Sequence, residues 1–197
     1  MKGDFSRVSF RPGKRYTGVR MQQGRVLLDS DWNEQLDIQR YLDVVARRDI
    51  IGLCGGPKGD GPDGSSLAGF DIQAQGADVV IGRGRYWVHG TLCVNDTDFL
   101  KVDKQPDLPV VTGVTGKAKP TTNGTYLVYL EAWQRHITAL EDPEIREKAL
   151  GGPDTATRSR TTWQVKFDKL GGPNANVSCD SIGTHWRPQD ADPDGTM

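Results

Sequence analysis

One stretch near the start of the chain repeats its apolar residues with the period of an α-helix. Its apolar positions follow the spacing i, i+3, i+4, i+7 and i+8, which lie on one helix face: Ile38, Tyr41, Leu42, Val45 and Ala46. Asp31 precedes them, and Glu34 three residues later completes a capping-box pattern. We therefore predict an amphipathic helix over residues 31–50, with Asp31 as its N-cap.

Beyond residue 69 the pattern changes to a period of two, which is typical of β-strands. The segments with this pattern are 70–74, 77–81, 84–90, 91–94, 125–133 and 161–167. Gly90 should separate two of them. Segment 125–133 is apolar on both faces, so we expect it in the centre of a sheet, whereas 161–167 alternates and should have one solvated face. The predicted fold is α+β and mostly β: an N-terminal arm and one amphipathic helix, then a loop-rich, mainly antiparallel β body.

Pattern and composition divide the chain into four parts. They are an N-terminal arm and docking helix (1–52), a Gly/Pro-rich loop (53–68), a β-rich body (69–170) and a linker-like tail (171–197). Inside the body, residues 142–150 have Pro at their second position and are followed by two glycines, which predicts a helix of one or two turns. The tail has no hydrophobic period, so we expect the native protein to continue beyond it.

Composition and net charge narrow the classes of function. The 197 residues are 36% hydrophobic, with 24 Gly and 11 Pro, which favours short strands joined by many loops. A net charge of -1 argues against a nucleic-acid-binding protein. No apolar run approaches the roughly 20 residues of a membrane span. The start lacks the apolar segment of a signal peptide, so we expect synthesis in the cytoplasm.

The arm differs from this neutral average, because its charges are nearly all of one sign. Residues 1–25 carry seven basic side chains against Asp4 alone. Such a polar segment buries little surface by itself, so we expect it to dock onto its own fold or onto a neighbouring subunit. Arg and aromatic residues are favoured interface anchors, and they single out Phe5, Arg7, Phe10, Tyr16, Arg20 and Trp32. For Phe5, Phe10 and Trp32, packing on their own domain remains the alternative.

Candidate chemistry elsewhere in the chain is sparse. Cys54, Cys93 and Cys179 form no C-x-x-C pair, so we expect reduced thiols. The loop residues Asp60 and Asp63 do not follow the spacing of an EF-hand. We therefore predict no metal and no cofactor.

Two rival functions rest on particular side chains. Paired carboxylates perform glycoside hydrolysis, and the candidates for an enzyme acting on cell walls or carbohydrates are Glu131, Glu141, Asp142 and Glu144. Their alternative role is to form ion pairs that fix a loop-rich fold. A glycan-binding module would instead use tryptophans, and the candidates are Trp87, Trp133 and Trp163. No nucleophile elbow, P-loop or dinucleotide fingerprint is present.

Three motifs carry a resemblance to a known family. They are MKGDFSR at residues 1–7 with YTGVRMQQGRV at 16–26 and DSDWNEQ at 29–35, YLVYLEAWQRHITALEDP at 126–143, and LGGPDTATR at 150–158 leading to WQV at 163–165. They resemble a family of bacterial proteins that are encoded near phage-tail-like contractile injection systems, over about residues 1–167. No catalytic residue is established for that family, so none carries over.

The resemblance implies a structural attachment protein of a contractile injection particle, of baseplate or tail-fibre type. Its partners would be particle subunits of the baseplate or tube and further copies of itself, with a trimer expected by analogy. Release from the cell as part of an extracellular particle would then be compatible with synthesis in the cytoplasm. The predicted helix with WNEQ at residues 32–35, followed by IGRGRYWVHG at 81–90, also looks like the start of phage baseplate and tail-fibre proteins, which is an analogy at the level of fold.

Overall fold

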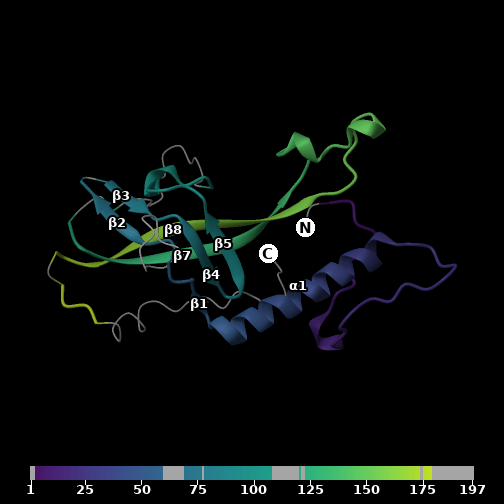
Figure 1. Cartoon of the computed structure of the whole chain (residues 1–197), viewed down its shortest axis with the longest axis horizontal. Coiled ribbons are helices and arrows are strands. Elements are labelled where there is room, and N and C mark those ends of the chain that lie inside the picture. Colours follow the sequence, from purple (N-terminus) through teal and green to yellow (C-terminus); the bar gives the residue numbers. More distant parts are fainter. Residues whose placement is uncertain are drawn as a thin grey trace.

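A long helix and a long two-stranded ribbon set the shape of the molecule (Figure 1). The computed structural model describes residues 3–59, 69–76, 78–107, 120, 123–173 and 175–178. Helix α1 spans Asp29–Ile51, and the ribbon pairs β7 (Thr125–Ile137) with β8 (Arg158–Gly171). Two small sheets lie against one end of the ribbon, and α1 runs away from them.

All strand pairs in the described part of the chain are antiparallel. One small sheet has the order β1-β4-β5 and the other β2-β3-β6. Their strands are β1 (Cys54–Gly55), β2 (Ile72–Gln75), β3 (Asp78–Ile81), β4 (Gly84–Val88), β5 (Thr91–Asn95) and β6 (Leu100–Lys101). Short 3-10 turns are η1 (Pro12–Lys14), η2 (Val102–Lys104), η3 (Pro143–Ile145) and η4 (Lys148–Leu150). The predicted α+β fold, mostly β with one main helix, is confirmed.

Helix α1 starts two residues earlier than its sequence predicts. Its N-cap is Leu28, which makes no side-chain capping bond, and Asp31 lies inside the first turn. The predicted capping box is therefore wrong. The physical reason is competition from the arm, because Glu34 accepts a hydrogen bond from the Ser9 hydroxyl and Asp31 lies 3.8 Å from Arg7.

The C-terminal half of α1 attaches the helix to the body. Gly90, at the turn between β4 and β5, has a φ of 77° and lies so close to the helix that an added Cβ would come within 2.5 Å of the Val44 carbonyl oxygen. The guanidinium of Arg47 lies 5.1 Å from the ring centre of Trp87. A glycine is thus required at the predicted strand break, both for its backbone conformation and for this close approach.

Strand β7 is not central, contrary to the expectation from its apolar faces. Its paired partner in the described part of the chain is β8 alone, over a register running from Ile137–Arg158 to Thr125–Gly171. Its apolar side chains are covered at one end of the ribbon, where the small sheets pack against it. There β4 lies near β7 and β5 near β8.

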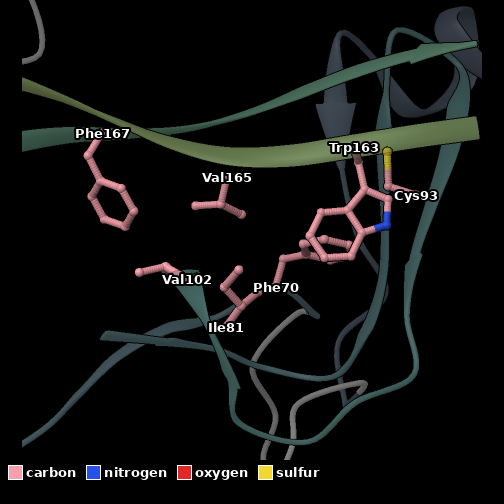
Figure 2. Close-up of a cluster of buried hydrophobic side chains, with 7 residues drawn as sticks. All are labelled: Phe70, Ile81, Cys93, Val102, Trp163, Val165 and Phe167. Carbon is pink, nitrogen blue, oxygen red and sulfur yellow. The ribbon is translucent and has the colours of Figure 1, made fainter. Parts of the chain in front are cut away.

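Strand β8 carries the hydrophobic core. Trp163, Val165 and Phe167 project from the same side of the strand and meet Phe70, Ile81, Cys93 and Val102 of the small sheets and their connections (Figure 2). The indole Nε1 of Trp163 donates to the Val94 carbonyl at 2.9 Å, and the ring packs edge-on against Phe70. Burial in this core raises the pKa of the Cys93 thiol to about 12.

The predicted solvated face of β8 is absent in its central part. Thr162 and Gln164 are buried although they alternate with the core residues. The segment just after η2, which precedes β7 and β8 in the chain, accounts for part of this burial, since Gln164 donates to the Asp107 carbonyl at 2.6 Å. The Gln105 side chain also pairs with the β8 backbone, donating to the Val165 carbonyl and accepting from its amide N–H. Alternation in one strand could not reveal a cover supplied by another segment.

Residues 142–150 form the two 3-10 turns η3 and η4 and no α-helix. Pro143 takes the predicted first position, and Gly151 ends the second turn with a φ of 83°. Several expectations fall on residues outside the described ones: most of the loop 53–68 with Asp60 and Asp63, Cys179, and most of the tail 171–197.

Candidate functional site

The arm, residues 3–28, runs along the N-terminal half of α1 and returns to enter it. The first half of the arm runs in the same direction as the helix. Its contacts show this, because Ser6 lies beside Asp29, Ser9 beside Glu34 and Phe10 beside Tyr41. The turn η1 then reverses the chain, and the amide of Val19 donates to the Gln35 side chain at 2.7 Å on the way back. The arm and this half of the helix form a unit that projects from the body (Figure 1).

Polar contacts hold the arm to the helix. The Ser6 amide and hydroxyl donate to the two carboxylate oxygens of Asp29 at 2.9 and 2.5 Å. These two bonds hold the pKa of Asp29 below its usual value. The Ser9 hydroxyl donates to Glu34 at 2.6 Å, and Arg7 lies 3.8 Å from Asp31. The acidic first turns of α1 therefore serve as acceptors for the arm.

The six predicted interface residues divide into two groups. Phe5 and Phe10 are half-buried against their own chain, with ring centres 6.0 Å from His136 and 5.8 Å from Tyr41. Arg7 is exposed but contacts Ser30 and Asp31. The other three, Tyr16, Arg20 and Trp32, are exposed. For Phe5 and Phe10, packing on the same chain is the role that the structure gives.

Besides the predicted Trp32, this region exposes Val26 and Leu27, which were not predicted as interface residues. Val26, Leu27 and Trp32 are 80%, 76% and 70% exposed. Met21, Leu28 and Leu36 are further exposed apolar side chains of the arm and helix. The available signal was the run Val26-Leu27-Leu28 in an otherwise polar arm. Large apolar patches on a protein surface mark sites of interaction.

A hollow of about 270 Å³ lies inside this apolar surface. Residues 19–22, 25–27 and Asp31 line it, so its wall combines Met21, Val26 and Leu27 with the cationic Arg20 and Arg25. Neither guanidinium has a side-chain partner among the described residues. Two cations and one carboxylate therefore share the wall of the hollow with apolar side chains, and the net positive charge fits an apolar side chain that has carboxylates beside it.

The connection between β7 and β8 forms a second projecting feature, which we call the tip (residues 138–157). It contains five acidic side chains, Glu141, Asp142, Glu144, Glu147 and Asp154, against two basic ones. Two leucines on it, Leu140 and Leu150, are 87% and 64% exposed. The turns η3 and η4 and a bridge between Arg146 and Asp154 give the tip a defined backbone.

The candidate catalytic carboxylates take part in local structure. Glu131 pairs with Lys166 across the ribbon, and Glu141 pairs with Arg135. Asp142 accepts from the Glu144 amide at 3.1 Å and so begins η3. Glu144 itself is exposed on the tip. These contacts are those expected of residues that fix a loop-rich fold.

The basic residues of the same cluster are also explained by the ribbon. Arg135 and Arg160 lie opposite each other in the register of β7 and β8, where like charges repel. Asp107 lies between them, 4.0 Å from Arg135 and 3.1 Å from Arg160. One carboxylate thus offsets the repulsion of the pair.

The candidate glycan-binding tryptophans do not form one surface. Trp163 is in the core, so its role in a surface site is excluded. Trp87 is half-buried beneath Arg47, and Trp133 is half-buried opposite Thr162 in the ribbon. Among the described residues, no group of three His, Cys, Asp or Glu side chains is placed to hold a metal ion.

The described part of the chain contains no helix that is both long and apolar enough to cross a membrane.

Residues 1–189 match the Family of unknown function (DUF6519). The chain belongs to this family. The DUF6519 match covers the arm, α1 and every described strand. No curated protein and no solved structure shows a significant match to the chain.

Proposed function

We propose that this chain is an attachment subunit that docks to other proteins through its arm and the N-terminal half of α1. The observation that carries the proposal is the exposure of three large apolar side chains, Val26, Leu27 and Trp32, on a unit that projects from a closed core. Burying such side chains against a partner is favourable by roughly 25 cal/mol for each Å² of apolar surface. The surface therefore gives docking a driving force.

The setting we propose is a contractile injection, phage-tail-like particle, in which the chain would be a baseplate or tail-fibre component. This part rests on the resemblance of the sequence motifs. Its partners would be subunits of the baseplate or tube together with copies of itself. The β body would then be the part held away from the attachment site.

The arm's construction supports attachment over catalysis. Hydrogen bonds from serine hydroxyls of the arm, and one from the arm's backbone to a glutamine, hold the arm against α1. The larger apolar side chains of the arm face solvent. The four candidate carboxylates offer no comparable site, because Glu131 and Glu141 are paired and Asp142 caps a turn. We therefore assign the interaction surface, and no active site, as the functional feature.

Substitutions on this surface test the proposal without altering the core. The triple variant Val26→Ser, Leu27→Ser and Trp32→Ser should fold normally and lose capture of the proteins encoded beside it when they are co-expressed. The matched control is Leu53→Ser, an exposed leucine just beyond the other end of α1, a helix about 35 Å long. Capture that is unchanged in the triple variant would refute docking through the arm.

A further inference from the structure

We propose that the hollow in the arm binds the tip of a second copy of this chain. The inference rests on the proposed docking role of the arm and names its first partner as the chain itself. It commits to two surfaces that the structure describes, the hollow lined by residues 19–22, 25–27 and Asp31, and the β7–β8 tip at residues 138–157.

Opposite charges on the two surfaces favour this pairing. Residues 5–28 of the arm carry six basic side chains and no acidic one, while the tip carries five acidic and two basic ones. Arg20 and Arg25 at the hollow, and Glu144 and Asp154 on the tip, have no side-chain partner among the described residues. Complementary free charges of this kind steer association and fix the orientation of the partners.

The apolar parts of the two surfaces also correspond. Leu140 is 87% exposed and is followed directly by Glu141 and Asp142. The hollow offers Met21, Val26 and Leu27 beside its two arginines. A leucine followed by two carboxylates is therefore matched to a hollow whose wall combines apolar side chains with a net positive charge.

The position of the two surfaces allows the contact to be made twice. In Figure 1 the arm and the tip project at the same end of the molecule and lie apart from each other. Two copies that meet at this end can each place their tip in the other's hollow, which is the reciprocal arrangement of a two-fold interface. The same contact repeated in one direction would close a ring of more copies.

A charge exchange between two variants tests the contact. One variant carries Arg20→Glu and Arg25→Glu, and the other carries Glu144→Lys and Asp154→Lys. Each variant alone brings like charges together, so self-association measured by light scattering should weaken at least about tenfold. Mixing the two should restore the wild-type mass, because every arm then meets a tip of opposite charge.

Two further samples make the result specific. Leu140→Ser should also weaken association, whereas Asp96→Lys, an exposed change in the turn after β5 and outside both the arm and the tip, should not. A wild-type chain that stays monomeric up to hundreds of micromolar, or two variants whose mixture stays monomeric, would overturn the inference. Capture of neighbouring proteins by the same samples reports separately on the docking role, which survives if only self-association is lost.

Discussion

Trp163 and Trp32 show how one residue type takes opposite roles in this chain. Trp163 is enclosed by the core and donates its indole N–H to Val94, whereas Trp32 faces solvent on the first turn of α1. Sequence reasoning treated both as surface candidates. It could not separate them, because the cover over Trp163 comes from Phe70 and other segments distant in sequence.

Replacing these two tryptophans should therefore affect stability very differently. We expect Trp163→Ala to lower the free energy of unfolding by about 3–5 kcal/mol, since it leaves a cavity in the core. Trp32→Ala should change that free energy by no more than about 0.5 kcal/mol, as for other surface positions. Urea unfolding measures both, and equal losses would contradict the assignment of Trp163 to the core and of Trp32 to the surface.

The side chain of Gln105 forms hydrogen bonds with the backbone of β8. Its amide group pairs with both backbone groups of Val165, and the residue is buried. Gln105→Leu should leave these two groups without partners and lower the free energy of unfolding by about 1–3 kcal/mol. Gln39→Leu, which removes only an exposed bond to Asp43, is the control in the same urea experiment and should be nearly neutral.

At the scale of elements, local patterns located the helix and most strands but not their partners. The pattern placed α1 and the strands within a few residues, and Gly90 marked the turn between β4 and β5. It misplaced β7 as a central strand and gave β8 a solvated face. Both errors concern which segments pack over a strand. That packing depends on contacts between residues far apart in the sequence, such as Gln164 with Asp107.

For the candidate site as well, the sequence predicted the location but only some of the residues. The excess of basic residues and the aromatic residues identified the arm, and Tyr16, Arg20 and Trp32 are exposed there. Phe5 and Phe10 instead pack on His136 and Tyr41, which a one-dimensional pattern cannot show because those partners are 131 and 31 positions away. The tip was recognised as a cluster of charges, but its exposed leucines became evident only in the structure.

The contact between the arm and α1 should weaken in acid. Hydrogen bonds from Ser6 lower the pKa of Asp29 below 3.8, so their contribution is complete above the unfolded-state pKa and is lost as the pH falls through the lowered value. The Ser6 amide resonance, followed by NMR during an acid titration, should report an apparent pKa below 3.8. A midpoint at or above 3.8, or an unchanged titration in Asp29→Asn, would contradict this contact.

At the scale of the whole molecule, core and attachment surface are separate. The seven buried residues of the main cluster come from the small sheets, their connections and β8, and none comes from the arm. Helix α1 joins the two regions through Val44 and Arg47 in its C-terminal half. Changes in the arm therefore leave the main core intact, and the ring contact of Phe5 with His136 of β7 is lost only when the start of the arm is removed.

The most direct test of this arrangement is to remove the whole arm, residues 1–28, with Val26 and Leu27 in it, and to measure mass in solution by light scattering, alone and with the proteins encoded beside it. The truncated chain should keep a cooperative unfolding transition, because its main core is untouched, and should no longer join the complex that the full chain forms. A truncated chain that enters this complex with full occupancy would contradict the account.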